Sequence, residues 1–432
     1  MGMTYSALWY LDEIATPLGL GGHWPALPIT GIHFDSREVQ PGDLFLAMRG
    51  GGAYTDGHAF IGDAAQRGAV AAIVTTPNAS VSIPQLVVPN VQAALVALGQ
   101  AARARFKGKV VAVGGGVGKT TTTALLKALL NAHAPEGSLN NHVGVPLTLA
   151  RLPLSAPACI CEVGTNHVGE IAPLAKQVRP DVALITNVVE EHLEGLHDLE
   201  TVRREELAVV EGLNPAGTLV VPEGLSLEGA GWQGKVLRFN PAAPLKVEIL
   251  EPTPARVACT NAALAVVQAL GITPDAAALA RLAAVQPPKG RGQVALVGGV
   301  TVIDDSYNAN PASVAAALVA LLQRPVQRRV VVLGDMRELG AEEQRYHAEL
   351  APQLAFADGV VLVGPLMQTL VPLLPPEKLW GTYPNPDDFV PEDLAPRLHA
   401  GDAVLVKGSK SVTYVRHFAE RLIAALAPQT HS

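Results

Sequence analysis

The chain has 432 residues, of which 49% are hydrophobic, 16% are charged and 4% are aromatic. This length exceeds one ordinary core and favours two to three domains, and the composition suits α/β layers rather than disorder. The 32 basic and 39 acidic residues give a net charge of −7, which offers no basic field for nucleic acid.

The sequence also argues against a protein held together by disulfides or zinc and against a membrane or secreted protein. The three cysteines form neither a disulfide framework nor a zinc-binding spacing. No apolar run reaches the roughly 18 residues that a membrane helix needs, and no signal-peptide pattern opens the chain. We therefore expect a soluble, cytoplasmic protein with no membrane insertion.

The first part of the chain alternates short strands with a helix. Apolar runs predict strands at residues 31–34, 43–48, 71–74 and 86–88. A helix is expected over residues 59–67, where Gly68 ends it. The pair Ile83-Pro84 marks a boundary, and an alanine-rich helix is expected from Val91 to about residue 104.

A glycine-rich loop comes next, between an apolar run at residues 110–113 and a helical pattern at 124–130. The loop consists of Gly114, Gly115, Gly116, Val117, Gly118, Lys119, Thr120 and Thr121. Glycines let backbone N–H groups turn toward an anion, and the N-terminus of the helix adds partial positive charge. Lys119 can reach the β- and γ-phosphates, and the Thr120 hydroxyl can hold Mg²⁺. The loop therefore predicts a nucleotide site, although Val113 replaces the first glycine of the strict pattern. The alternative is a strand-to-helix turn with a solvent-facing lysine.

Polar side chains follow the next two predicted strands. The strand at residues 158–162 ends in Glu162, and His192 follows the strand at 182–186. If these strands are parallel neighbours, both side chains share one rim of the sheet with the glycine-rich loop. A carboxylate beside a triphosphate is a reasonable Mg²⁺ ligand. Taken alone, Glu162 is a rim residue, and a lone histidine such as His192 more often caps or packs.

The remaining pattern predicts a second sheet. A strand at residues 218–221, a proline-rich tail and a helix from Asn261 to Leu270 precede the hinge-like stretch Pro287 to Gly292. Strands alternating with helices are then expected at residues 300–304, 330–334, 360–364 and 403–407. Alternation of this kind favours parallel, doubly wound sheets.

Motifs in all three parts resemble the Mur ligase family, and within it the MurF-type ligases. The matching stretches are Asp35-Ser36-Arg37, Asn140-Asn141-His142-Val143-Gly144-Val145-Pro146, Glu162 to Ile171, His192 to Gly195, Asp304-Asp305-Ser306-Tyr307-Asn308-Ala309-Asn310-Pro311, Gly334 to Gly340 and Leu405 to Ser409. One such motif is a weak signal, but this many in the right order is a strong one.

The resemblance implies an α/β fold with the three-domain Mur ligase architecture. A small α/β N-terminal domain over residues 1–83 would bind the UDP substrate. A central P-loop ATPase-like parallel sheet over 84–292 would bind ATP, and a Rossmann-like, doubly wound C-terminal domain over 293–432 would follow. The resemblance also implies ATP and Mg²⁺ as cofactors and a ligase that joins D-alanyl-D-alanine to UDP-MurNAc-tripeptide through an acyl phosphate, in peptidoglycan synthesis. We expect a monomer.

By the same resemblance, particular residues receive roles. Catalytic groups would be Lys119, Glu162, His192 and Glu206, and Mg²⁺ ligands would be Thr120, Glu162 and His192. Contacts to ATP beyond the loop would come from Arg291, Asp305 and Asn308. The substrates would meet Ser36, Arg37, Asn140, Asn141, Asp335 and Lys407.

Each of the weaker assignments has a structural alternative. Arg291 can be a solvated hinge charge, and Asp305 can simply start a turn. Lys407 can be a structural lysine at a strand end, and Asp335 can cap a helix near Leu339. The pair Asp35-Ser36 is also ordinary turn chemistry.

Three departures from the family pattern alter the site. Gly114 and Val117 stand where the family has threonine and a polar residue. Val257-Ala258 replaces a His-Asn pair. Counted without gaps from His192, the family's carbamylated lysine falls on Glu206. We hypothesise that the Glu206 carboxylate replaces the carbamate, directly or through water. The alternative is a solvated helix face with surface ion pairs of little energetic value.

Other functions remain open from the sequence. Another Mur ligase or a folylpolyglutamate synthase-like ligase shares the ATPase core and the amide chemistry. A different class is a nucleotide-binding relative without catalysis, which would bind ATP but release no phosphate in response to peptide substrate.

Overall fold

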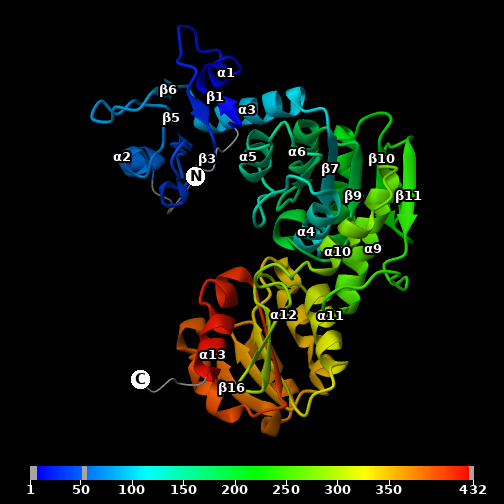
Figure 1. Cartoon of the computed structure of the whole chain (residues 1–432). Helices are drawn as coiled ribbons and strands as arrows, with labels where there is room; N and C mark the ends of the chain where they lie inside the picture. Colours follow the sequence, from blue (N-terminus) through cyan, green and yellow to red (C-terminus); the bar gives the residue numbers. More distant parts are fainter. Residues whose placement is uncertain (1–6, 51–55, 428–432) are drawn as a thin grey trace.

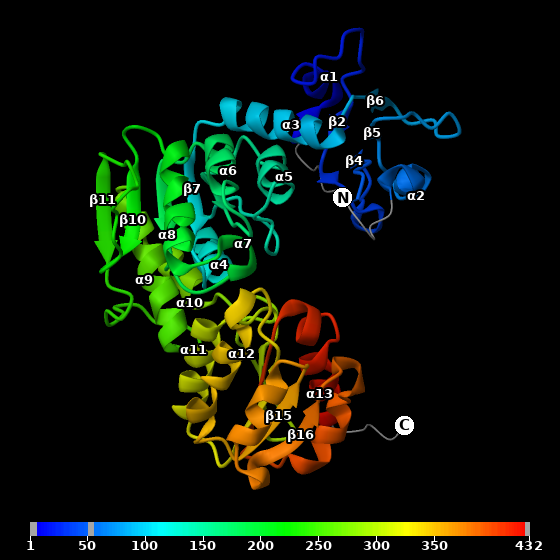
Figure 2. The same ribbon diagram turned by 180° about the vertical axis from the view of Figure 1, so that it is seen from behind.

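The computed structural model describes residues 7–50 and 56–427, which form three sheet-based bodies in chain order (Figure 1). The start of the chain, where no signal-peptide pattern is expected, lies outside the described residues. The central body lies between the N-terminal and C-terminal bodies in both views (Figures 1 and 2). Within the described ranges, no helix combines the length and apolarity that crossing a membrane requires.

The N-terminal body contains a four-stranded parallel sheet in the order β3-β4-β5-β6 and a two-stranded antiparallel sheet of β1 and β2. Its elements are β1 (Trp9–Tyr10), α1 (Leu11–Ala15), β2 (Pro28–Ile29), β3 (Ile32–His33), β4 (Leu44–Leu46), α2 (Ile61–Gln66), β5 (Ala71–Val74) and β6 (Gln85–Val87). The helix expected over residues 59–67 is shorter, because its first turn is a 3-10 helix at Gly57–Phe60.

Helix α3 (Val91–Arg105) connects the first two bodies. It packs against α5 (Gly144–Ala150) so closely that a Cβ on Gly99 would lie 2.8 Å from the Pro146 carbonyl oxygen. Its apolar face shares one buried cluster with the N-terminal strands. The Trp9 indole donates a 2.8 Å hydrogen bond to the Ala150 carbonyl, so buried polar contacts also join the two bodies. The boundary at residue 83 stays a prediction.

The central body is a five-stranded sheet in the order β11-β10-β9-β7-β8, and every neighbouring pair runs parallel. Its strands are β7 (Lys109–Gly114), β8 (Ala158–Glu162), β9 (Val182–Ile185), β10 (Thr218–Pro222) and β11 (Lys235–Phe239). Its helices, besides α5, are α4 (Lys119–Leu130), α6 (Ile171–Val178), α7 (Leu193–Leu196), α8 (Leu199–Leu207), α9 (Pro254–Ala269) and α10 (Ala276–Ala283).

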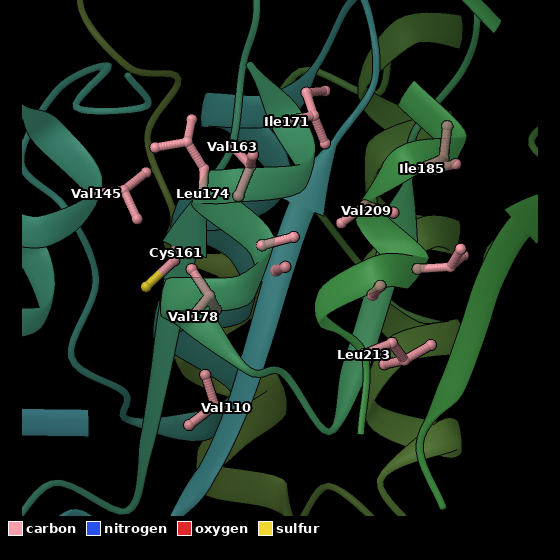
Figure 3. Close-up of a cluster of buried hydrophobic side chains, with 14 of the residues drawn as sticks. Val110, Val145, Cys161, Val163, Ile171, Leu174, Val178, Ile185, Val209 and Leu213 are labelled. Carbon is pink, nitrogen blue, oxygen red and sulfur yellow. The ribbon is translucent and has the colours of Figure 1, made fainter. Parts of the chain in front are cut away.

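Both faces of the central sheet are buried. Figure 3 shows one apolar cluster, in which Leu174 and Val178 of α6 pack beside Val163 and Cys161 at the end of β8. A second cluster covers the other face with side chains of α4, α9 and α10. Apolar runs buried on both faces are typical of parallel α/β sheets, so the near-continuous hydrophobic strands of this segment have a direct cause.

Helix α9 begins at Pro254, seven residues before the position expected from the sequence. Thr253 caps the helix through a 3.3 Å hydrogen bond from the Arg256 N–H, and Pro254 occupies a first-turn position where its fixed φ is favourable. The expectation of a later start was wrong because clustered prolines were interpreted as loop.

The C-terminal body is a six-stranded sheet in the order β12-β13-β17-β14-β15-β16. Strand β12 pairs antiparallel with β13, and the other pairs are parallel. Its elements are β12 (Gln293–Val297), β13 (Val300–Asp305), α11 (Pro311–Leu322), β14 (Arg329–Gly334), α12 (Glu343–Ala348), β15 (Gly359–Val363), β16 (Leu379–Tyr383), β17 (Ala403–Lys407) and α13 (Phe418–Leu426). The sequence predicted the four inner strands but not the two edge strands.

Candidate active site

The glycine-rich loop joins the end of β7 to the start of α4 at the carboxyl edge of the central sheet. Gly115 and Gly118 have φ angles of 107° and 90°, which side chains rarely allow. A Cβ on Gly115 would also lie 2.4 Å from the Thr186 hydroxyl. The backbone of Val117 is held by Asn187, whose side chain accepts from its N–H at 2.9 Å and donates to its carbonyl at 2.8 Å. The Asn187 side chain thus holds the main chain at Val117, the loop position that lacks a polar side chain of its own.

Lys119 is enclosed by this loop and does not face solvent. Its Nζ donates to the carbonyls of Gly115 and Gly116 and lies 3.6 Å from Glu191 Oε1. Burial lowers the pKa of Lys119, but the charges of Glu191, Glu206 and Glu162 outweigh it and raise that pKa, so the ammonium remains charged. The solvent-facing alternative is therefore wrong.

Glu162 lies opposite Val113 in the register of β8 and β7, which places it beside the loop. The side chain is 1% exposed, and its Oε1 accepts a 3.0 Å hydrogen bond from Asn140 Nδ2. Its Oε2 is buried and has no hydrogen-bond partner among the described residues. Burial raises the pKa of Glu162, against the opposing effect of Lys119 and Arg291. A buried carboxylate oxygen without a partner fits a cation site.

Thr120 occupies the first turn of α4 near Glu162. Its hydroxyl lies 3.2 Å from Ser138 Oγ, and Ser138 Oγ also accepts a 2.7 Å hydrogen bond from Arg291. Within residues 7–50 and 56–427, no group of three or more His, Cys, Asp and Glu side chains is arranged to hold a metal ion. Thr120 and Glu162 offer oxygen atoms of the kind that Mg²⁺ binds together with waters and phosphate oxygens.

Glu206 lies directly under the loop, on α8. It is 1% exposed, and its Oε2 accepts a 2.6 Å hydrogen bond from the Gly115 N–H. A Cβ on Gly114 would lie 2.9 Å from the same oxygen, so two of the departures from the family pattern contact each other. Burial, opposed by Lys119, raises the pKa of Glu206 to about 7. The solvated-face alternative is wrong, because Glu206 is buried and its carboxylate accepts from the loop backbone.

His192 connects the central body to the C-terminal body. Its Nδ1 contacts Glu338 Oε2, and the Glu194 N–H donates a 3.2 Å hydrogen bond to the Glu338 carbonyl. His192 and Glu338 both have left-handed backbones, with φ of 51° and 65°. Burial lowers the pKa of His192, but the Glu338 hydrogen bond and the Glu191 charge outweigh it and raise that pKa.

A cavity of about 370 Å³ opens from the loop toward the C-terminal body. Arg291 lines it and stacks with its guanidinium 4.3 Å from the centre of the Tyr307 ring. Asp305 and Lys407 form an ion pair of 2.7 Å at its edge, and Lys407 also donates to the Asn308 carbonyl at 3.1 Å. Alanine side chains of α9 and α11 form the apolar wall. The wall residues are Ala255, Ala258, Ala262, Ala312, Ala316, Ala317 and Ala320.

A second cavity of about 340 Å³ lies on the other side of Glu191, between the two bodies. It is lined by Glu191, His192, Asn308, Ala309, Asn310, Arg337, Glu338, Ser409, Lys410, Ser411 and Val415. The cationic side chains of Arg337 and Lys410 therefore face a space that adjoins the site of the glycine-rich loop.

Some predicted site residues have other partners. Asn141 caps α5 by accepting from the Val143 and Gly144 N–H groups at 3.1 and 3.0 Å. Asp335 accepts from the Met367 N–H at 2.9 Å, so it does not cap a helix near Leu339. That alternative is wrong, because Asp335 is fully buried at the end of β14.

Ser36 and Arg37 lie in the N-terminal body. Ser36 is buried, whereas Arg37 is exposed and pairs with Asp35 at 2.5 Å. The structure also brings to the site residues that the sequence did not single out for it. These are Ser138, Asn187, Glu191, Cys259 and Glu338, together with Tyr307, which stacks on Arg291. For Glu191 the sequence does offer a signal of a place in the site, because this residue directly precedes His192.

Comparison with known proteins gives a consistent result along the chain. The description "Mur ligase family, catalytic domain" matches residues 28–106, "Mur ligase middle domain" matches 113–229, and "Mur ligase, glutamate ligase domain" matches 290–410. The chain is 34% identical over 377 residues to the UDP-N-acetylmuramoyl-tripeptide–D-alanyl-D-alanine ligase of Escherichia coli (strain K12), covering 78% of this chain and 82% of that protein. The ligase of the same description from Rickettsia prowazekii (strain Madrid E) is 30% identical over 420 residues, covering 88% and 92%.

Solved structures agree with the sequence comparison. MurF from Acinetobacter baumannii aligns with a TM-score of 0.80 and 27% identity, covering 96% of this chain and 99% of that chain. MurF ligase from Thermotoga maritima in complex with ADP aligns with a TM-score of 0.76 and 27% identity, covering 92% and 97%. The similarity thus extends over all three bodies.

Proposed function

Because this chain belongs to the Mur ligase family, we propose that it uses ATP to join D-alanyl-D-alanine to UDP-MurNAc-tripeptide in peptidoglycan synthesis. The observation that carries the proposal is the glycine-rich loop with Lys119 and Glu162, which faces two cavities between the central and C-terminal bodies. The named relatives support this reaction and give no support to a folylpolyglutamate synthase-like or non-catalytic alternative. Cytoplasmic location and a monomeric state stay predictions.

The reaction has two steps. A terminal carboxylate oxygen of the tripeptide attacks the γ-phosphorus, and the bond to the β-phosphate oxygen breaks, giving an acyl phosphate and ADP. The amine of the dipeptide then attacks the acyl carbon, and the bond to phosphate breaks, giving the amide, phosphate and a proton. The first step joins two anions, so the enzyme mainly positions them and neutralises their charge.

Lys119 supplies the fixed positive charge for this step. Its ammonium group lies against the loop carbonyls, and it would bind the β- and γ-phosphates from there. Thr120 and Glu162 would hold one Mg²⁺, and His192, which lines the second cavity, would be a ligand of a second Mg²⁺. When bound, Mg²⁺ would neutralise phosphate oxygens.

The other assigned residues act on the substrates. Ser36 and Arg37 would hold the uridine nucleotide, and Arg291, Asp305 and Asn308 would line the ATP cavity. Asn140 would orient Glu162 through their hydrogen bond. Asn141, Asp335 and Lys407 would act on the substrates indirectly. Asn141 holds the start of α5, Asp335 holds the backbone at Met367, and Lys407 holds Asp305.

Glu206 would replace the family's carbamylated lysine as an anion under the loop. Its carboxylate holds the Gly115 N–H and faces Lys119, so it sets the position of the loop and the local charge. A glutamate supplies this anion without CO₂.

Replacing Glu206 with glutamine should make the protein more stable at pH 8 and leave its stability unchanged at pH 4. The folded-state pKa of about 7 lies above the ordinary 4.5, so ionising this group costs up to about 3 kcal/mol once the pH exceeds 7. Below pH 4.5 the carboxyl is neutral in both states and the cost disappears. Chemical denaturation of both proteins at several pH values measures the difference.

The same variant tests the functional role of Glu206. Turnover should fall and the Mg²⁺ concentration needed for half-maximal turnover should rise. Unchanged turnover and unchanged Mg²⁺ dependence would show that Glu206 has no functional role in the site.

The reaction itself is tested with purified protein, Mg-ATP and UDP-MurNAc-tripeptides bearing lysine, ornithine or diaminopimelate. With D-alanyl-D-alanine present, mass spectrometry should show the ligated pentapeptide product for at least one tripeptide. Phosphate release should depend on both substrates. Phosphate release that ignores the dipeptide would instead indicate a nucleotide hydrolase and contradict the proposal.

A further inference from the structure

The contact between His192 and Glu338 is built from both side chains and backbone. Nδ1 of the imidazole contacts the Glu338 carboxylate, and the backbone of Glu338 accepts from the Glu194 N–H at 3.2 Å. Both residues have left-handed backbones, a conformation that needs support from its surroundings. The two residues come from different bodies, so this geometry exists only while the bodies are in contact.

The contact leaves one imidazole nitrogen available. His192 Nε2 makes no hydrogen bond to any residue within 7–50 and 56–427, whereas Nδ1 is engaged by the carboxylate. A carboxylate at Nδ1 favours the tautomer with its proton on that nitrogen, which leaves a lone pair on Nε2. Histidines that bind metals commonly have such a carboxylate on the opposite nitrogen.

The position of the ring suits this role. His192 and Glu338 line the 340 Å³ cavity together with Glu191, and Glu191 Oε1 lies 3.6 Å from Lys119 Nζ. One side of the cavity therefore adjoins the place where the phosphates are expected, and the other side carries Glu338 from the C-terminal body.

We infer that Glu338 is a positioning residue that fixes the tautomer and orientation of His192, so that His192 binds the Mg²⁺-nucleotide only when the C-terminal body is docked. The inference rests on the proposed function, in which His192 is a metal ligand. Because coupling between two events is reciprocal, binding of the metal-nucleotide also strengthens the docking of the C-terminal body. Binding of the metal-nucleotide to the central body and docking of the C-terminal body at the 340 Å³ cavity are thereby linked.

The test compares Glu338→Ala and Glu338→Gln with the wild type, using the whole chain. The Glu338 side chain is 49% exposed, so neither change should prevent folding. Glu342→Gln is the matched control, because this carboxylate lies four residues away in the same segment and forms an exposed 2.7 Å ion pair with Arg345.

The first readout is ¹⁵N NMR of the histidine rings at pH 8.5, with the His192 signal assigned by its loss in His192→Asn. The wild type, the control and Glu338→Gln should keep the proton on Nδ1, because a glutamine oxygen can also accept it. Glu338→Ala should move the proton toward Nε2. An unchanged tautomer in Glu338→Ala overturns the inference.

The second readout is the affinity for Mn²⁺ in the presence of a non-hydrolysable ATP analogue, measured by electron paramagnetic resonance. Glu338→Ala should weaken binding by about 10- to 100-fold, as loss of such a partner typically does. The double variant with His192→Asn should be no weaker than His192→Asn alone, because Glu338 acts through the ring. Additive losses overturn the inference.

A third measurement distinguishes failure of the proposed metal role of His192 from failure of the inference about Glu338. Mn²⁺ with the ATP analogue should broaden the His192 signal of the wild type strongly. No broadening means that His192 is not a ligand, which refutes the metal role in the proposed function and this inference with it. Strong broadening with equal Mn²⁺ affinity in Glu338→Ala refutes only the inference.

Discussion

An alanine at position 119 should lower kcat/KM for ligation by about 10³-fold, which corresponds to about 4 kcal/mol of transition-state stabilisation. Lys119 is the cation closest to the loop carbonyls, and it faces three carboxylates, those of Glu162, Glu191 and Glu206. Without it, the site presents negative charge to ATP. The loss should therefore affect both nucleotide binding and the rate of acyl phosphate formation.

Steady-state kinetics and calorimetric titration with an ATP analogue measure these two effects separately. Lys127→Ala is the matched control, because Lys127 lies in the last turn of the same helix and is exposed. Its activity should equal that of the wild type. Activity within tenfold of the wild type in Lys119→Ala would contradict the assignment of the loop as the phosphate site.

Replacing Glu162 with glutamine should have opposite effects on activity and stability. Ligation should fall by at least about 100-fold, since losing even an outer partner of a metal ligand costs 10- to 100-fold in metal affinity. The melting temperature should stay the same or rise. The buried Oε2 has no hydrogen-bond partner among the described residues, and burial raises the pKa of this carboxyl, so its charge costs folding free energy.

Activity at increasing Mg²⁺ and thermal unfolding without nucleotide check both parts. Glu211→Gln is the control, because this carboxylate is exposed and forms a 2.7 Å surface pair with Lys176. That variant should leave activity unchanged and change stability little. A Glu162→Gln protein that is much less stable than the wild type would show that the carboxylate is structural.

The nucleotide site could be predicted from sequence because its signal is local. Gly115, Gly118 and Lys119 adopt backbone and side-chain positions that depend mainly on the strand before them and the helix after them. Glu162 and His192 could be placed on the same rim from the rule that parallel strands end at one edge. The structure supports that geometry, since β8 and β9 both pair with β7.

The environment of Glu206 could not be predicted in the same way. Four consecutive charged residues, Arg203 to Glu206, have the appearance of a solvated helix face. In the structure Glu205 and Glu206 point inward and accept hydrogen bonds from backbone N–H groups, and Arg203 pairs with the exposed Glu200. Which side of a charged helix is buried depends on backbone donors that lie 34 to 91 positions away in the chain.

Long-range contacts also explain the missed edge strands and the missed partner of His192. Strand β12 has intermediate or exposed side chains, so it lacks the apolar run that marks an inner strand. Glu338 lies 146 positions from His192, and no local pattern connects the two.

The contact between Gly114 and Glu206 limits how this part of the chain can diverge. Any side chain at position 114 would meet the carboxylate oxygen at about 2.9 Å, a distance that requires one of the two groups to move. The two positions are therefore coupled, because moving the Glu206 carboxylate away from a β-carbon at 114 would disturb the hydrogen bond that it accepts from the Gly115 N–H. Double-mutant cycles should therefore find the effects of substitutions at positions 114 and 206 non-additive.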